Sequence, residues 1–468
     1  MKKIYLALGL AAGMVFSSCS DFLDKQPSTS LPVEEAITSI TDLEYAVNGI
    51  AYIMSESRMT YSADFAIYAD LRGEDFRAVS NNNQAGPYNR YSITKNDQEA
   101  YFAYYYFYKA IANVNKVLSV VDNVPYSESE QADFNNCKGQ LYAWRAMLHF
   151  DLARIYATIP VIASDVNAAN SGIVLATETY DPGYVSARAT LKQTYDQILA
   201  DFEVALPLLT KEKTDGYINY WAALALRSRV YMYNGQYSEA LADAKEVMSS
   251  PIYKLYTRDN YVSVWSKEFT DESLFEMKIN TSYNAQRNSV GFYCDSEGYG
   301  ECAFVEEAPL YQYLVAHPED IRSQLIKDQT SGSDAGYYPA KYPGRENNLN
   351  INNPKIIRLS DVYLMAAEAA YHMNDVTAAA GYVNAVRKNR IENYSEVSTV
   401  TLEDILFERR VELFAENSMS FDYWRNKKSI NSFYAGEITY NDLRTILPIP
   451  QEEIDMAPSL LVQNPGYK

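Results

Sequence analysis

Hydrophobic residues recur every three or four positions through most of the chain, which is the spacing of helices that bury one face. One such stretch, residues 42–56, follows a candidate N-cap at Thr41. Another, residues 97–122, carries aromatic side chains on nearly every side, which predicts a helix buried by other helices. Residues 135–157 and 187–208 are predicted to supply further helices. The chain is therefore predicted to be mainly α.

Two segments of the pattern repeat each other. Residues 219–250 and residues 358–390 each predict two helices joined by a short turn, and a shift of 139 positions superposes Gly235 on Asn374. Helical hairpins of this length resemble tetratricopeptide units, which must stack because no single unit can bury its own apolar face. The expected fold is a tetratricopeptide-like helical-repeat scaffold with long irregular loops and minor β structure.

Long stretches without periodicity separate these helices and contain most of the Gly, Pro, Asn and Ser residues. They are residues 58–96, 160–186, 251–301 and 317–356. Loops of this length are uncommon in compact domains unless they have a function, and binding residues are often displayed on loops. A helical scaffold with tyrosine-bearing loops is typical of a binding protein.

The N-terminus has the pattern of a secretory signal. Lys2 and Lys3 precede an apolar run from residue 4 to residue 16, which is too short to span a bilayer, and Cys19 follows two serines. This pattern resembles the acylation site of bacterial lipoproteins, with residues 1–18 as the signal peptide and Cys19 as the acylated residue. The alternative is an ordinary signal peptide with an incidental cysteine.

The charge narrows the class of partner. The chain has 60 acidic and 41 basic residues and a formal net charge of −19, without a basic cluster. Such a chain is not expected to bind the phosphate backbone of a nucleic acid. We expect residues 19–210 and 211–468 to form N- and C-terminal regions, with residues 19–468 packed as one unit.

Metal, redox and catalytic motifs are missing from the sequence. The three histidines are too widely spaced for a zinc site, and we expect no cofactor, while a role for calcium stays open. Pairing of Cys294 with Cys302 also stays open. Acid pairs such as Glu306 and Glu307 are consecutive, which does not place two carboxylates on either side of a glycosidic bond. We therefore expect no enzymatic activity. The alternative is hydrolysis by two carboxylates that are far apart in the sequence and come together in the fold.

Tyrosine is the outstanding feature of the composition, at 42 of 468 residues. Flat rings stack on the C–H faces of sugars, and planar amides, carboxylates and guanidinium groups bind hydroxyls. Residues of these types in the loops are predicted to contact ligand; they are Tyr61, Tyr68, Asp70, Arg72, Asp75, Arg77, Asn82, Tyr88, Tyr91, Tyr293, Tyr299 and Tyr338. The alternative is that these tyrosines cover the helices beneath them. Among the four tryptophans, Trp265 is the one expected to be exposed.

Several segments together resemble one family. They are CSDFLDKQP at 19–27, RAMLHFDLARIYATIP at 145–160, the repeat at 222–241, IIRLSDVYLMAAEAAY at 356–371, ILFERRVELFAE at 405–416, FDYWR at 421–425, LPIPQEEID at 447–455 and QNPGY at 463–467. In order and coverage they resemble the SusD/RagB outer-membrane lipoproteins of Gram-negative bacteria. Asn417 and Met419 depart from the glycine and arginine usual there. The charged residues of 405–416 are expected to form ion pairs along one helix.

The resemblance implies a function. Members of this family are lipid-anchored at the cell surface on the outer membrane and act as lids on a SusC-type TonB-dependent transporter. They capture a nutrient, most often an oligosaccharide, and in some branches, typified by RagB, a peptide. The helical repeats are expected to face the transporter and the opposite, loop-rich face to bind ligand. The ligand contacts of the family lie outside its shared motifs, so no binding residue is carried over.

Overall fold

The computed structural model describes residues 32–79, 84–181, 183–329, 331 and 334–467, so Cys19 and the signal segment lie outside the described residues. The longer helices are α3 (Ile40–Ile53), α6 (Gln98–Leu118), α7 (Gln131–Tyr156), α8 (Leu191–Ala205), α9 (Tyr220–Asn234), α10 (Tyr237–Met248), α13 (Leu359–His372), α14 (Val376–Lys388) and α15 (Leu402–Leu413). Short helices are α2 (Val33–Ala36), α4 (Tyr68–Leu71), α5 (Gly86–Asn89), α11 (Val290–Tyr293), α12 (Pro309–Ala316), α16 (Met419–Arg425) and α17 (Gln451–Met456). The mainly helical prediction is confirmed.

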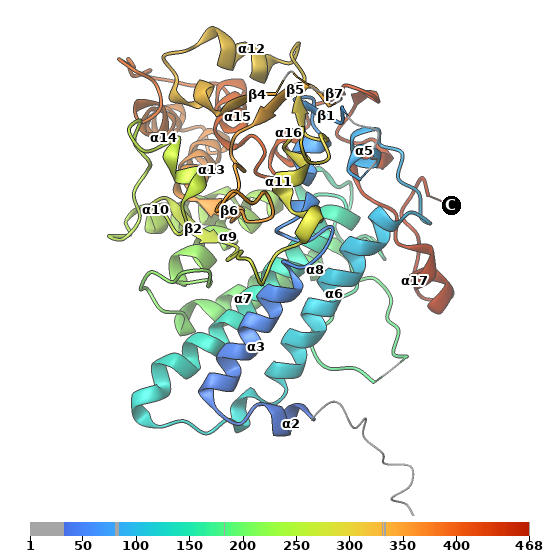
Figure 1. The fold of residues 1–468 in the computed structure, drawn as a ribbon. Coiled ribbons are helices and arrows are strands. Elements are labelled where there is room, and N and C mark those ends of the chain that lie inside the picture. The colour runs from blue at the N-terminus through green and yellow to red at the C-terminus, as the bar shows by residue number, and fades with distance from the viewer. Residues whose placement is uncertain (1–31, 80–83, 182, 330, 332–333, 468) are drawn as a thin grey trace, which may run out of the picture.

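Helices α3, α6, α7 and α8 form the N-terminal half of the scaffold, with α7 packed against the other three (Figure 1). Helix α7 is buried along most of its length, because α3 and α6 cover one side and α8 and α9 cover another. The predicted start of α3 is corrected by two residues. Ser39 is the N-cap instead of Thr41, since its hydroxyl oxygen accepts a hydrogen bond from the backbone N–H of Asp42.

The repeated hairpins are confirmed as α9–α10 and α13–α14, which stack next to each other (Figure 1). Gly235 ends α9 with a φ of 76°, and Asn374 takes a φ of 65° at the same position of the second hairpin. Glycine and asparagine both tolerate this left-handed conformation, which explains why one hairpin has glycine and the other has asparagine at the same position. The two helices of the first hairpin cross closely where the Ser228 hydroxyl donates to the carbonyl oxygen of Ala240 at 2.8 Å.

The described residues form four two-stranded antiparallel sheets, which are the minor β structure that the sequence predicts, and three of them are built by the long loops and their flanking residues. The strands are β1 (Phe76–Arg77) with β3 (Ala303–Phe304), β2 (Ser273–Glu276) with β6 (Lys355–Arg358), β4 (Ile326–Gln329) with β5 (Gly336–Pro339), and β7 (Ile430–Ser432) with β8 (Gly436–Ile438). Two of these sheets join loops that are far apart in the sequence. The loops are therefore packed onto one another and onto the helices.

Helix α15 was expected to carry ion pairs between its own residues, and this is wrong. The charged side chains in its second half are buried and pair with other elements: Glu408 with Arg322, Arg409 with Asp422, Arg410 with Asp75, and Glu412 with Arg358. The reason is that this half of α15 is covered by neighbouring elements, among them α13 and α16, while the exposed Glu403 at its start pairs with Lys428.

The core is nearly continuous. One hydrophobic cluster includes residues from Ile40 to Leu461, and a smaller one lies between α13, α14 and α15.

Cys137, Cys294 and Cys302 are buried free thiols, so Cys294 and Cys302 are not bonded here. Among the described helices, none combines the length and the apolar character that crossing a membrane requires. The division at residues 210 and 211 stays a prediction.

Candidate functional site

Most of the residues predicted to contact ligand lie in the core. Nine of them are buried: Tyr61, Tyr68, Asp70, Arg72, Asp75, Tyr88, Tyr91, Tyr293 and Tyr338. The Arg72 guanidinium lies 4.4 Å from the ring centre of Tyr91, and the Tyr61 hydroxyl donates to Asp151. A ligand reaches none of these nine side chains in this conformation. The loop of residues 61–91 has the composition of a binding loop, but these side chains are used in packing, for example Tyr68 against Phe421 of α16 and Asp75 against Arg410 of α15.

The three remaining predicted residues have different surroundings. Arg77 is half-buried, and its guanidinium lies 5.3 Å from the ring centre of Phe433, an exposed side chain on the β7–β8 turn. Tyr299 is half-buried against Tyr293, with their ring centres 5.3 Å apart. Asn82 lies outside the described residues. The structure therefore does not bring the predicted residues together as one accessible site.

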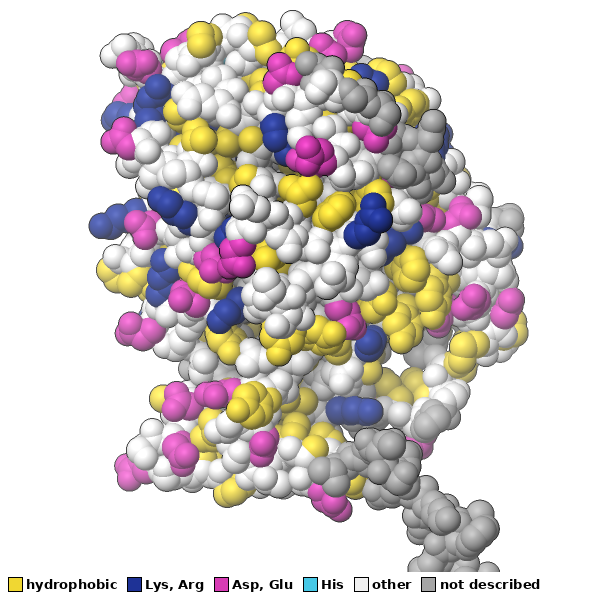
Figure 2. Space-filling model, in the orientation of Figure 1, with side chains coloured by type: hydrophobic (Ala, Val, Ile, Leu, Met, Phe, Trp, Pro, Cys, Tyr) yellow, Lys and Arg dark blue, Asp and Glu magenta, His cyan; other side chains and the backbone are white. Residues whose placement is uncertain are grey.

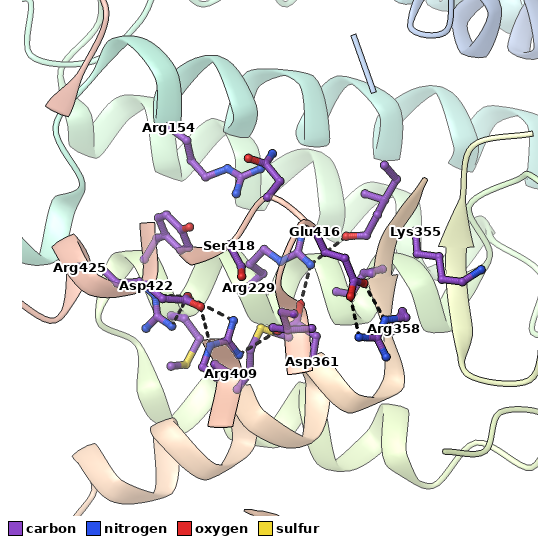
Figure 3. A pocket seen from close by; sticks show the side chains of 17 residues that line it. Arg154, Arg229, Lys355, Arg358, Asp361, Arg409, Glu416, Ser418, Asp422 and Arg425 are labelled. Atoms are coloured by element: carbon purple, nitrogen blue, oxygen red, sulfur yellow. Dashed lines mark hydrogen bonds and ion pairs between the residues drawn. The ribbon is translucent and has the colours of Figure 1, made fainter. Parts of the chain in front are cut away.

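A charged cavity lies in the interior, where α13, α15 and α16 meet α7 and α9 (Figure 3). Asp361 receives Arg229 at 2.7 Å and Arg409 at 2.9 Å. Burial raises the pKa of Asp361, but these two guanidinium groups outweigh it and lower the pKa to about 2. The cavity volume is about 20 Å³, enough for a water molecule and too small for a sugar ring. This cavity belongs to the ion-pair network that holds the fold.

Exposed aromatic rings instead gather along α6, where Figure 2 shows hydrophobic side chains at the surface. Tyr101 and Tyr105 are one turn apart and their rings stack, with centres 5.6 Å apart and planes at 20°. Tyr105 is 42% exposed, and Phe102 and Tyr106 are half-buried beside it. The expectation that other helices bury α6 on nearly all sides is therefore wrong for this face.

The same surface continues onto α3 and the loop after β2. Tyr52, 41% exposed, meets Tyr283, 50% exposed, edge to face at a ring-centre distance of 5.4 Å. Lys109 connects them to α6, because its ammonium group lies 3.2 Å from the Glu56 carboxylate and 5.9 Å from the ring centre of Tyr105. A hydrogen bond to Glu56 raises the pKa of Tyr52. We call Tyr52, Tyr101, Phe102, Tyr105, Tyr106 and Tyr283 the aromatic surface.

Planar polar groups border the aromatic surface at its other end. The Arg58 guanidinium lies 5.6 Å from the ring centre of Phe102 and donates to Glu99 at 2.9 Å. Burial and the nearby charge of Glu452 on α17 raise the pKa of Tyr101. Exposed rings flanked by carboxylates, an ammonium and a guanidinium are the groups that bind the faces and hydroxyls of a sugar.

Sequence reasoning missed this surface, although the helical period of α6 contained a signal. The small and aliphatic residues Ala100, Ala103, Ala110 and Ile111 all lie on the buried face together with Phe107. At about 100° per residue, Tyr105 lies roughly 160° round the helix from Phe107. The alanines therefore identified the core face, and the rings opposite them were the ones free to bind. Nothing in the sequence pointed to Tyr52 or Tyr283.

No group of three or more His, Cys, Asp or Glu side chains in the described part of the chain is arranged to hold a metal ion.

A family model described as "Starch-binding associating with outer membrane" matches residues 21–232. A second model, described as "SusD family", matches residues 188–467, which is more than half of the chain. The chain belongs to the SusD family. The first description associates such proteins with the outer membrane.

Similar proteins span nearly the whole chain. A putative sugar binding protein from Bacteroides vulgatus ATCC 8482 is 32% identical, with a TM-score of 0.84 over 92% of this chain and 100% of that chain. SusD-like protein P38 of Formosa agariphila is 22% identical over 89% of this chain and 90% of its own length. Surface glycan-binding protein A from Bacteroides thetaiotaomicron, in complex with laminarihexaose, is 19% identical, with a TM-score of 0.73 over 91% of this chain and 100% of that chain. At that identity the likeness shows the fold alone.

The SusD-family motifs of this chain are structural. Residues 405–416 and 421–425 form the buried ion pairs of α15 and α16. Asn417, which replaces the usual glycine, has a φ of 62°, a conformation that glycine adopts most easily and asparagine tolerates. Its side-chain oxygen accepts from the backbone N–H of Ala69 at 2.8 Å. The departure at residue 417 is thus accommodated in the fold.

Proposed function

We propose that this SusD-family protein captures an oligosaccharide at the cell surface through the aromatic surface of α6. The observation that carries the proposal is the stack of Tyr101 on Tyr105, exposed on one side and bordered by Lys109 and Glu56. The stack offers a flat face for the C–H surface of a sugar ring, and its charged neighbours offer hydrogen bonds for the hydroxyls. Support comes from the glycan-binding protein of the same fold that was solved with laminarihexaose. Half-buried Arg77 and Tyr299 stay candidate contacts at the periphery.

Calorimetric titration of laminari-oligosaccharides and other glucans tests the binding surface. Tyr101→Ala and Tyr105→Ala should each weaken binding about tenfold or more, since stacking on one aromatic ring is worth about 0.5–1.5 kcal/mol beyond burial of its area. Tyr126→Ala is the matched control, because Tyr126 is also 42% exposed but stacks on Phe134, away from this surface. Unchanged binding by both α6 variants, with the melting temperature preserved, would reject this surface as the ligand site.

Delivery is proposed to follow capture. Acylation of Cys19 anchors the protein to the outer membrane, and the protein acts as a lid on a SusC-type TonB-dependent transporter. One acyl chain holds a protein weakly, so stable anchoring requires a multiply acylated cysteine. Native mass spectrometry of the lipoprotein, extracted gently from its own membrane, tests these points together. A lipid mass on Cys19 and a co-purifying transporter are expected. An intact preparation without the lipid mass would contradict the anchor, and one without a transporter would contradict the proposed role as a lid.

A peptide is the alternative nutrient, as for a RagB-type lid. Trp265 was expected to be exposed, but it is buried, as are Trp144, Trp221 and Trp424. The rings available at the surface are therefore tyrosines and phenylalanines, which suit peptide side chains as well as sugars. In the native mass spectrum, hexose-spaced masses on the complex would support an oligosaccharide as the nutrient. A heterogeneous ladder of peptide masses would instead identify the nutrient as a peptide.

A further inference from the structure

Helices α3 and α7 lie side by side (Figure 1). A second pocket lies between them and is also lined by the loop before α9. Its volume is about 260 Å³, room for several water molecules and slightly below the size of pockets that hold drug-sized ligands. Helix α7 contributes Asp133, Asn136, Cys137 and Gln140, whose spacing of three and four residues places them on one stripe. None of the residues that form the aromatic surface lines this pocket.

The pocket presents two carboxylates without a cation. Glu44 of α3 and Asp133 of α7 both line it, and among the described residues neither side chain forms an ion pair or a hydrogen bond. Their charges act on the same buried thiol: burial, then Glu44 and Asp133, raise the pKa of Cys137 to about 12. Two like charges that face one cavity favour a positively charged group between them.

The pocket also presents two amide donors whose orientation is fixed. Gln140 is only 2% exposed, and its Oε1 accepts from the backbone N–H of Ile218 at 3.1 Å. Asn136 accepts from the backbone N–H of Thr210 in the same way, also at 3.1 Å. Because a backbone N–H can only donate, these two bonds identify the oxygen of each side-chain amide as the atom that faces the loop. The NH₂ group of each amide therefore points away from that bond and can donate elsewhere. The Nε2 of Gln140 forms no hydrogen bond with a described residue, so it is free to donate to a ligand or a water molecule in the pocket.

We propose that this pocket binds a small molecule that carries a primary ammonium group next to hydroxyl or carbonyl oxygens. The ammonium group lies between the carboxylates of Glu44 and Asp133, and the oxygens accept from the amide groups of Asn136 and Gln140. The volume suits one amino-sugar ring or one amino-acid unit. The site is separate from the aromatic surface, so its occupant is a second ligand and not a part of the oligosaccharide bound there.

Three probes of matched size test the proposal by calorimetry on the full chain in detergent at pH 6.5. D-glucosamine has the ammonium and the oxygens, D-glucose has the oxygens alone, and cyclohexylamine has the ammonium alone. D-glucosamine should bind at least tenfold more tightly than either of the others. Equal binding of D-glucose, or no heat from D-glucosamine at millimolar concentration, would overturn the proposal.

Variants then locate the bound probe. Glu44→Gln combined with Asp133→Asn should weaken D-glucosamine binding tenfold or more without unfolding the chain, because both side chains are exposed. Glu128→Gln, an exposed acid just before α7, is the control and should leave binding unchanged. If binding is lost in Tyr105→Ala and kept in the double variant, the probe binds at the aromatic surface and the pocket is rejected.

A chemical readout does not depend on the affinity measurement. Cys137 borders the pocket, so bound D-glucosamine should slow its alkylation by iodoacetamide, followed by peptide mapping. The buried thiols of Cys294 and Cys302, which do not line this pocket, provide the internal control. Slowing at Cys137 alone supports the site, and equal slowing at all three cysteines would show general stabilisation and contradict it.

Discussion

Glu412 contacts three arginines, Arg322, Arg358 and Arg390, and all four side chains are shut off from solvent. Burial raises the pKa of Glu412, but the arginines outweigh it and hold the pKa well below the ordinary carboxyl range. Removing a charge from water costs several kcal/mol per ion, so such a cluster is stable only while every charge has its partners. The network couples α15 to β6 and to the end of α14.

Glu412→Gln should therefore destabilise the protein strongly. The change leaves three buried arginines with one carboxylate fewer, and breaking a buried pair costs about 3–5 kcal/mol of unfolding free energy. Urea denaturation followed by circular dichroism measures it. Glu437→Gln, on an exposed position of β8, should change the unfolding free energy by less than about 0.5 kcal/mol. A loss below about 1 kcal/mol in Glu412→Gln would mean that the network contributes little.

Asp70 makes stability depend on pH. Burial raises its pKa from an ordinary value of 3.8 to about 8, against the lowering effect of the Asn417 N–H and of Lys341. The folded protein therefore keeps the proton while the unfolded chain loses it, so this group lowers stability as the pH rises from about 4 to about 8. The slope for one such group is on the order of 1.4 kcal/mol per pH unit.

Asp70→Asn should remove this dependence. The stability of the variant relative to the wild type should rise between pH 5 and pH 8 and stay level above that range. Urea titrations of both proteins at each pH measure the difference, which cancels the contributions of the other carboxyl groups. A difference that is constant with pH would show that Asp70 is ionised in the folded protein throughout.

The sequence showed which residue types the loop of residues 61–91 contains, but not their burial. Tyr68 and Asp70 have the composition of a ligand contact, yet Tyr68 packs on Phe421, with ring centres 6.0 Å apart, and Asp70 accepts from the Asn417 N–H at 2.6 Å. These partners lie more than 300 positions away in the chain. Local composition cannot predict such contacts, because an exposed and a buried tyrosine loop use the same residues.

At the scale of elements, the two hairpins were the most predictable part of the fold. A shift of 139 residues superposes the first residues of α9 and α13, and those of α10 and α14. The periodicity sufficed because each helix buries one stripe on its neighbour, a local property. Helix α6 was only half predictable: its bounds followed from the pattern, but its exposed face depended on which helices pack beside it.

The turn of each hairpin gives a matched pair of substitutions. Gly235→Ala should cost about 1–2 kcal/mol, because an L side chain is strained at a φ of 76° and the added Cβ would lie 3.1 Å from Val161. Asn374→Gly, at the equivalent turn, should change stability by less than about 1 kcal/mol, because the conformation already suits both residues. Thermal denaturation compares them, and equal losses would show that the left-handed turn is not the cause.

At the scale of the whole molecule, the C-terminal segment binds back onto the N-terminal helices. The backbone N–H of Leu447 donates to the carbonyl of Ile155 at 2.8 Å, and the amide of Asn464 donates to the carbonyl of Tyr156 at 2.8 Å. Asn464 also accepts from Arg188 at 2.7 Å. The end of α7 is thereby completed by residues some 300 positions further along, which argues for one cooperative unit.

We predict that Asn464→Ala lowers the stability of both regions together. Loss of a buried amide that makes these bonds costs about 1–3 kcal/mol. Native-state hydrogen exchange should show the same decrease in the free energy of opening for the slowly exchanging amides of α7 and of α13. The control Asn441→Ala, at an exposed position, should leave both values unchanged. A loss confined to α7 would mean that residues 19–210 unfold independently of residues 211–468.

The burial of all four tryptophans, set against the exposure of Tyr52, Tyr105 and Tyr283, has a spectroscopic consequence. Tryptophan emission should be blue-shifted and should report on unfolding, while a ligand on the aromatic surface should leave it almost unchanged. The same ligand should perturb tyrosine absorbance in an ultraviolet difference spectrum. Folding and capture can thus be followed as two independent optical signals in one cuvette, and a lack of tryptophan quenching is no evidence against binding.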